Sequence, residues 1–202
     1  MPRPPILPTI PWEKIFQSAK SYEKWLQSTE NPENRDKMEA WRKKLVLPSY
    51  AELYLAQLSR PVHVVAIAED WCGDVVRHVP CLMKIADVCS QVRVRFIHRA
   101  DHPDVFIRYL TNGGEAIPKF IFLNESFVEC GNWGPMPDAC RELIARGKAC
   151  NNVALARQLV AKAYDADSDR KIVFDELLRL VDIAASQSPD PAKSLLKRFL
   201  DL

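Results

Sequence analysis

Residues 62–68 limit the possible folds of this chain of 202 residues, because nearly all their side chains are apolar and most are β-branched. Such a run is typical of a strand that is covered on both faces. A helical pattern follows over 72–90 and an alternating strand pattern over 92–98, and further strands are expected over 118–123 and 127–133. This order, β-α-β-α-β-β-α, predicts a mixed sheet with helices on both faces.

Amphipathic patterns flank this central part on both sides. Helices are expected over 12–29, 32–45, 49–59, 101–110, 137–146, 153–164 and 171–185, with a short one after Pro191. Ser49 and Asp101 are the expected N-caps of two of them, and in the helix over 171–185 the expected inward residues are Ile172, Leu177, Leu180 and Ile183. The chain is therefore divided into a helical N-terminal extension (1–58), an α/β core (59–150) and C-terminal helices packed on the core (151–202).

Charge and composition exclude some classes of partner. The chain carries 28 Lys+Arg and 26 Asp+Glu, so 28 − 26 gives a net charge of +2, and we expect no nucleic-acid partner because no clustered basic excess is present. No apolar run has the length that spans a membrane, and the proline-rich start has no signal-peptide core. A cytoplasmic location is expected, and the oligomeric state stays open.

The six cysteines are dispersed rather than clustered, so most are expected to be reduced and buried. Cys72 differs because it falls where a buried strand ends and a helix begins. Unpaired backbone N–H groups and the positive end of the helix dipole favour a thiolate there. Three acidic neighbours oppose this effect, so the direction of the net pKa shift stays open; they are Glu69, Asp70 and Asp74.

The stretch from Glu69 to Pro80 resembles the active site of thioredoxins, in which Trp-Cys-Gly-X-Cys precedes a helix proline. Two further landmarks agree in order and spacing. Thioredoxins begin their third core strand with a cis-proline, matched by Ile117-Pro118 before Lys-Phe-Ile-Phe, and carry a glycine after the fourth strand, matched by Gly134. The resemblance covers roughly residues 60–150, and its wording is closest to bacterial thioredoxin-like proteins with helical extensions.

The resemblance implies a thioredoxin-like three-layer α/β/α sandwich with a mixed four-stranded sheet and helical N- and C-terminal extensions. It also implies that Cys72 is the catalytic nucleophile. A substrate groove would be formed by Trp71, Gly73, Asp74, Ile117, Pro118, Trp133 and Gly134. For both tryptophans, packing within the fold is an equally weighted alternative.

Two positions depart from the thioredoxin pattern. Val75 stands where the second, resolving cysteine falls, and Ala66 stands where the family keeps a buried acid. An intramolecular partner for Cys72 is therefore missing. Cys81 lies about 13 Å further along a regular helix, beyond the reach of a disulfide, and is expected in the core. Cys130 is a less favoured resolving candidate.

A metal site is disfavoured, although Asp74, His78 and Cys81 share one face of the predicted helix. No motif completes a four-ligand zinc site, and a solvated Asp74–His78 pair is preferred. An iron–sulfur cluster shared between subunits is disfavoured because the Cys-Gly-Phe-Ser motif of monothiol glutaredoxins is matched only at Cys-Gly. No metal or resident cofactor is expected, and glutathione enters only as a co-substrate.

Three hypotheses for function follow, from different classes. The narrowly preferred one is a monothiol thiol–disulfide oxidoreductase, in which Cys72 attacks a protein disulfide or a glutathionylated substrate and external glutathione resolves the product. The second is a redox-inactive thioredoxin fold that binds a peptide or a partner through the groove. The third is a scaffold whose helical ends build an oligomer.

Overall fold

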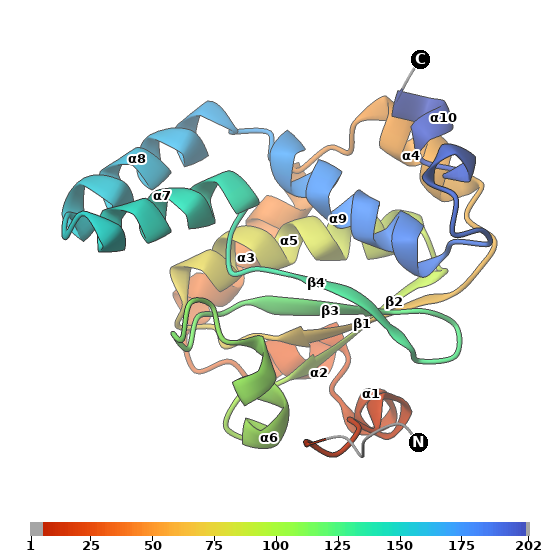
Figure 1. The fold of residues 1–202 in the computed structure, drawn as a ribbon, viewed down its shortest axis with the longest axis horizontal. Helices are drawn as coiled ribbons and strands as arrows, with labels where there is room; N and C mark the ends of the chain where they lie inside the picture. The colour runs from red at the N-terminus through yellow and green to blue at the C-terminus, as the bar shows by residue number, and fades with distance from the viewer. Residues whose placement is uncertain (1–5, 201–202) are drawn as a thin grey trace.

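The computed structural model describes residues 6–200 and contains a mixed four-stranded sheet in the order β2-β1-β3-β4 (Figure 1). The strands are β1 (Val62–Ile67), β2 (Val92–Ile97), β3 (Lys119–Leu123) and β4 (Glu129–Trp133). β1 runs parallel to β2 and antiparallel to β3, and β3 runs antiparallel to β4. The predicted mixed sheet is confirmed.

Helices cover both faces of the sheet, which confirms the predicted α/β architecture (Figure 1). On one face lie α5 (Gly73–Val88) and α9 (Lys171–Ala184); on the other lie α1 (Trp12–Ser18), α2 (Tyr22–Gln27) and α6 (Pro103–Phe106). α3 (Pro32–Lys44) packs on α5, α4 (Ser49–Ala56) contacts α5 and α10 (Lys197–Leu200), and α7 (Asp138–Ala149) packs on α8 (Val153–Ala166).

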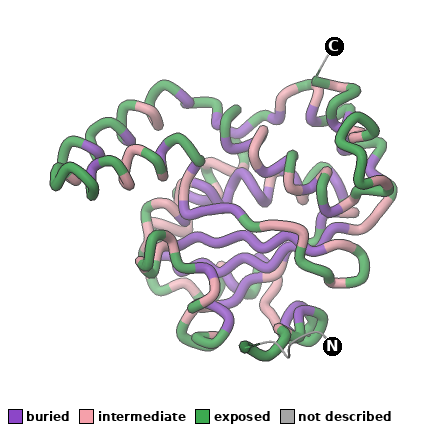
Figure 2. The backbone as a smooth tube through the Cα atoms, viewed as in Figure 1, coloured by how far each residue is buried: buried purple, intermediate pink, exposed green. Residues whose placement is uncertain are grey.

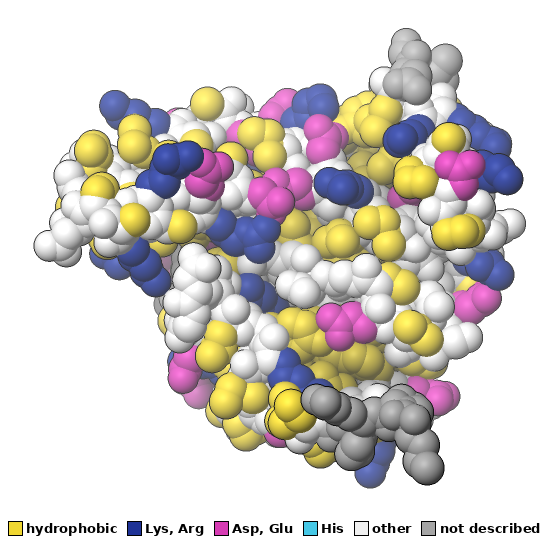
Figure 3. All heavy atoms as spheres, in the orientation of Figure 1, with side chains coloured by type: hydrophobic (Ala, Val, Ile, Leu, Met, Phe, Trp, Pro, Cys, Tyr) yellow, Lys and Arg dark blue, Asp and Glu magenta, His cyan; other side chains and the backbone are white. Residues whose placement is uncertain are grey.

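The core lies at the centre of the sheet. All residues of β1 and β3 are buried, as expected for strands covered on both faces, and Figure 2 shows the central strands as continuous buried segments. β2 alternates at its start, where Val92 and Val94 are buried and Arg93 is exposed. Charged side chains of both signs are interspersed over the surface seen in Figure 3, in line with the near-zero net charge.

The prediction of one helix over 12–29 is wrong, because two helices separated by residues 19–21 are present. Lys20 forms an isolated β-bridge with Phe96: each backbone N–H donates to the other residue's carbonyl oxygen, at 3.0 Å and 2.8 Å. The bridge gives hydrogen-bond partners to backbone groups on the free edge of β2. A continuous helix over these residues would leave those groups of β2 without partners. Ser21 then caps α2 by accepting from the backbone N–H of Lys24.

Two predicted caps are also wrong. Ser49 is the first residue of α4, and Pro48 occupies the N-cap position without a side-chain hydrogen bond. Asp101 caps nothing, because α6 begins at Pro103 after the N-cap His102 and passes into a short 3₁₀ helix over Ile107–Tyr109. Pro103 suits the first helical position, where no N–H is needed.

In α9 the predicted inward face is right in part, because Leu177 and the partly buried Leu180 pack on the core. Ile172 and Ile183 are 47% and 41% exposed, whereas Leu177 is fully buried. The buried face is formed by Val173, Phe174, Leu177, Leu178, Val181 and Ala184. Both sets recur at helical spacing, so the periodicity alone did not select the face that meets the sheet.

Candidate active site

The loop that carries the cysteine is held by the N-terminal helices. The indole N–H of Trp25 donates to the carbonyl oxygen of Ala68 at 3.2 Å, directly after β1. The carboxylate of Asp70 accepts from the backbone N–H of Asn31 at 2.7 Å, and the side-chain amide of Asn34 donates to the Asp70 carbonyl at 2.8 Å. The segment before α5 is therefore fixed by contacts from residues 25–34.

Cys72 occupies the N-cap of α5 and is half-buried. Its thiol donates a hydrogen bond to the carbonyl oxygen of Ile117, with the sulfur 3.3 Å from the oxygen. The Ile117–Pro118 peptide bond is cis. The helix start after β1 and the segment before β3 thus meet at the sulfur atom, so a molecule bonded to that sulfur lies beside the backbone of Ile117.

Burial raises the pKa of the Cys72 thiol above its ordinary value. The backbone N–H groups of Val75 and Asp74 oppose this by stabilising the thiolate, while the negative charges of Asp74 and Glu69 raise the pKa further. The net shift of the Cys72 pKa, whose direction the sequence left open, is therefore upward. Cys72 is mostly a neutral thiol at neutral pH.

Trp71 is the exposed wall beside the cysteine, with 57% of its surface accessible. Its indole N–H donates to the carboxylate of Glu69 at 3.0 Å. Arg99 forms an ion pair with the same carboxylate at 3.1 Å, and its guanidinium lies 5.1 Å from the centre of the Trp71 ring. Glu69 thereby holds both groups in place, and Trp71 presents an apolar surface to solvent next to Cys72.

Gly134 is buried and packs closely against the backbone of Pro118. Its φ is +115°, and a Cβ added there would lie 2.1 Å from the Pro118 carbonyl oxygen, so only glycine fits. Beside it, the buried ammonium of Lys119 donates to the Gly134 carbonyl at 2.8 Å and to the Thr111 hydroxyl. Burial lowers the pKa of Lys119 to about 8. These contacts fix the backbone around Ile117.

Trp133 is only 2% exposed. Its ring stacks on Phe120 with centroids 5.4 Å apart, and its indole N–H donates to the carboxylate of Glu176 at 2.5 Å. The edge of the His78 ring meets it at a centroid distance of 5.1 Å. The structure thus places Trp133 in the core, as the packing alternative expects, and leaves Trp71 as the tryptophan beside the thiol.

Asp74 and His78 do not form the predicted solvated pair. His78 is fully buried, and its Nε2 lies 4.0 Å from the Asp74 carboxylate. The hydroxyl of Tyr164 lies between them: it donates to Asp74 at 2.9 Å and lies 3.2 Å from His78 Nε2. Burial lowers the pKa of His78 well below its ordinary value, so the imidazole is neutral. A neutral imidazole that donates from Nε2 to the Tyr164 hydroxyl completes this row of hydrogen bonds.

All six cysteines fall within the described residues and are free thiols, so Cys72 has no disulfide partner in the structure. Val75, at the resolving position, is fully buried. Cys81 is fully buried in α5, as predicted, and burial raises its pKa to about 12. Cys130 lies at the far end of β4, opposite Phe122 and Leu123, roughly 10 Å or more along the sheet from Lys119. That is too far for a disulfide with Cys72.

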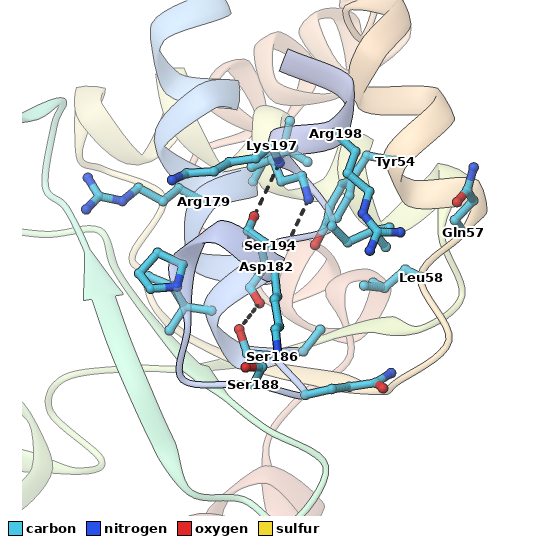
Figure 4. Close-up of a pocket in the computed structure, with 18 of the residues that line it drawn as sticks. Tyr54, Gln57, Leu58, Arg179, Asp182, Ser186, Ser188, Ser194, Lys197 and Arg198 are labelled. Atoms are coloured by element: carbon cyan, nitrogen blue, oxygen red, sulfur yellow. Dashed lines mark hydrogen bonds between the residues drawn. The ribbon is translucent and has the colours of Figure 1, made fainter. Parts of the chain in front are cut away.

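Within residues 6–200, no group of three or more His, Cys, Asp or Glu side chains is arranged to hold a metal ion. Over the same range no helix is both long and apolar enough to cross a bilayer. A cavity of about 1220 Å³ lies between α4, α9 and the C-terminal segment, where Tyr54, Asp182 and Ser194 line it (Figure 4). Cys72 does not line that cavity and instead lines a smaller one of about 530 Å³.

Several residues near Cys72 were missed by the sequence analysis. Lys119 follows the matched proline directly and was hidden by its place in an apolar strand. Tyr164 and Arg170 come from the C-terminal helices, 92 and 98 positions after the cysteine (164 − 72 and 170 − 72). Nothing in their local pattern marks them. Tyr164 and Arg170 reach the start of α5 only through the packing of the C-terminal helices, which no local sequence pattern indicates.

The mixed sheet, the cysteine at the N-terminus of the helix after β1 and the proline before β3 together define a thioredoxin-like α/β protein. A family model described as Thioredoxin matches residues 19–151, which is more than half of the chain. The chain therefore belongs to this thioredoxin family. A search of curated proteins finds no match to it.

Two solved structures share the fold. A protein of unknown function from Pseudomonas aeruginosa superposes with a TM-score of 0.67 and 17% sequence identity, covering 86% of this chain and 98% of the other. An HIV epitope scaffold superposes with a TM-score of 0.66 and 17% identity, covering 84% of this chain and 96% of the scaffold. At this identity the likeness shows a common fold and nothing about activity.

Proposed function

We propose that this protein is a monothiol thiol–disulfide oxidoreductase that acts on mixed disulfides, either of a protein or of a glutathionylated substrate, through Cys72. The observation that carries the proposal is the position of the sulfur at the N-cap of α5, 3.3 Å from the Ile117 carbonyl oxygen. A disulfide substrate that reaches the sulfur meets exposed Trp71 on one side and the Ile117–Pro118 backbone on the other.

The exchange proceeds in two balanced steps. The Cys72 thiolate attacks the glutathione sulfur of a protein–glutathione disulfide, forms a Cys72–glutathione disulfide and releases the protein thiolate, which takes up a proton. A second glutathione thiolate then attacks the glutathione sulfur of that adduct, releases Cys72 and leaves as glutathione disulfide. The protein–glutathione disulfide is thus reduced to the protein thiol, and the transferred glutathionyl group leaves with the one added glutathione as glutathione disulfide. Val75 removes the intramolecular alternative to this second step.

The raised pKa of Cys72 sets the pH range of the reaction. Only the thiolate attacks, so the fraction of reactive enzyme is small at neutral pH and grows as the pH approaches the pKa. A thiolate of higher pKa is intrinsically the stronger nucleophile, which offsets part of this loss. The proposal therefore describes a slow enzyme at neutral pH whose rate rises towards alkaline pH.

Turnover of a glutathionylated peptide in excess glutathione tests the proposal. Wild type and Cys150→Ser, which removes an exposed cysteine on another part of the surface, should turn over equally. Cys72→Ser should fall to the uncatalysed rate. Equal rates for wild type and Cys72→Ser would remove the proposal.

A second candidate is the redox-inactive binding module, favoured by the raised pKa of Cys72 and by the burial of Val75. Here the surface beside Trp71 binds an extended peptide without exchanging disulfides. A partner that wild type captures should then be captured equally by Cys72→Ser and lost on Trp71→Ala. Loss of capture in Cys72→Ser would count against this candidate.

A further inference from the structure

A cavity of about 530 Å³ opens beside Cys72, on the side of α5 that faces α3, α8 and the start of α9. The thiol residue and Gly73 form one edge of it. Trp41 contributes from α3, Tyr164 from α8, and two arginines complete the wall: Arg77 on α5 and Arg170 at the N-cap of α9. The cavity therefore places two guanidinium groups within the surroundings of the reactive sulfur.

Both guanidinium groups have buried nitrogen atoms without hydrogen-bond partners in the described part of the chain. Arg170 is only 2% exposed, and neither its Nε nor its Nη1 has a hydrogen-bond partner among the described residues. The Nε of Arg77 is also buried without a partner in that part of the chain. No carboxylate of residues 6–200 forms an ion pair with either arginine. A buried cation without a counter-ion is costly, so an anion from outside the chain would relieve it.

The two arginines are held in place by aromatic rings. The guanidinium of Arg170 lies 4.4 Å from the centre of the Trp41 ring. That of Arg77 lies 3.9 Å from the centre of the Tyr164 ring and donates from Nη2 to the Tyr164 carbonyl at 2.8 Å. Stacking fixes the planes of both groups while leaving donors free. A preorganised pair of this kind is suited to a planar, bidentate anion such as a carboxylate.

The nearby acids do not neutralise this charge through direct contact. Asp74 lines the cavity, but its carboxylate accepts from the Tyr164 hydroxyl, and burial raises its pKa. Asp167 is buried and accepts from the backbone N–H of Ile172. Each acid is used by a partner within the fold, so the arginine donors stay free for a ligand.

We propose that this cavity is an anion subsite, in which Arg77 and Arg170 bind a carboxylate of the small thiol whose sulfur exchanges with Cys72. This inference rests on the proposed function and narrows its substrate class to thiols and disulfides that carry a carboxylate. The N-terminal N–H groups of α5 add to the positive field at the mouth of the cavity. A neutral or cationic disulfide of similar size gains nothing from the site.

Binding without chemistry gives the first test. S-methylglutathione keeps both carboxylates of glutathione but has no free thiol, so calorimetric titration measures the subsite alone. Wild type and Cys72→Ser should bind it, and Arg77→Gln should weaken binding by about tenfold or more. Arg157→Gln, at an exposed position of α8, is the matched control and should bind as wild type does. Absence of binding, or equal binding by Arg77→Gln, would overturn the subsite.

Substrate preference gives the second test and uses a variant at each arginine. The rate of Cys72 adduct formation should favour glutathione disulfide over neutral hydroxyethyl disulfide and cationic cystamine. The preference should shrink about tenfold in Arg77→Gln and in any folded Arg170→Gln protein. Exchange that ignores ligand charge would remove the subsite and leave the proposed function standing. Binding of S-methylglutathione by a protein that performs no disulfide exchange would support the subsite and remove the proposed function.

Discussion

The hydroxyl of Tyr164 donates to the carboxylate of Asp74 at 2.9 Å, although 90 positions separate the two residues. This bond ties α8 to the first turn of α5, beside Cys72. It also explains why His78, whose Nε2 lies 3.2 Å from the same hydroxyl, is buried as a neutral ring. The C-terminal helices therefore form part of the surroundings of the thiol.

The buried His78 predicts a loss of stability in mild acid. Its folded-state pKa lies well below the ordinary 6.5, so below about pH 6.5 the unfolded chain takes up a proton that the folded chain does not. The free energy of unfolding should then fall as the pH is lowered from 6.5, by at most about 1.4 kcal/mol per pH unit from this group. Asp74, Arg77 and Arg170 are the charged neighbours of His78. All three are kept when wild type is compared with a variant that lacks only the His78 ring.

Urea unfolding from about pH 8 to about pH 5 measures this effect. His78→Gln should show a shallower decline than wild type, while His102→Gln, outside the network, should keep the wild-type slope. An unchanged slope in His78→Gln would show that the ring is not the group whose protonation opposes folding.

The fold was predictable because its main signals are local. The apolar run of β1, the alternation at the start of β2 and three landmarks at compatible spacing all lie within residues 60–150. The break at Lys20 was not predictable, since the bridge to Phe96 is a tertiary contact that overrides a helical pattern. Cys72 was found from its place at a helix start, whereas Arg170 has no local signal that connects it with the thiol.

Restoring the missing cysteine should restore intramolecular resolution. Val75 is fully buried three residues after Cys72, and cysteine is somewhat smaller, so Val75→Cys should fold at a cost of about 1 kcal/mol. Oxidation should then yield a disulfide between Cys72 and the introduced thiol, and substrate release should no longer need added thiol. Thiol counting and peptide mapping measure the bond.

Val79→Cys is the control for that variant, because Val79 is equally buried but lies two turns from Cys72. It should form no disulfide with Cys72 under the same oxidant. A Val75→Cys protein that folds and still keeps both thiols free would contradict the placement of Val75 beside the sulfur.

Alanine at Gly134 and alanine at Gly73 should have different effects on stability. A Cβ at Gly134 would lie 2.1 Å from the Pro118 carbonyl oxygen at a φ of +115°, so Gly134→Ala should destabilise the protein by roughly 2–4 kcal/mol. A Cβ at Gly73 meets no atom within 4 Å, so Gly73→Ala should be neutral or stabilising by up to about 1 kcal/mol. Thermal unfolding separates the two, and equal losses would refute the packing described around Pro118.

Removing the negative charge of Asp74 should make the Cys72 thiol more reactive. The charge of Asp74 raises the pKa of Cys72, so Asp74→Asn should lower that pKa and speed alkylation by iodoacetamide near about pH 8. Asp101→Asn, at an exposed loop position, should react like wild type. An alkylation profile shifted to higher pH in Asp74→Asn would contradict the electrostatics given for the site.

Intact-mass spectrometry after brief exposure to glutathione disulfide measures whether Cys72 exchanges disulfides. We predict one glutathione adduct per chain, mapped to Cys72, formed faster at about pH 9 than at about pH 7 and removed by added glutathione. Cys150→Ser should behave identically and Cys72→Ser should stay unmodified. Modification of Cys150 while Cys72 stays free, or no adduct at either pH, would show that the sulfur at the start of α5 does not exchange.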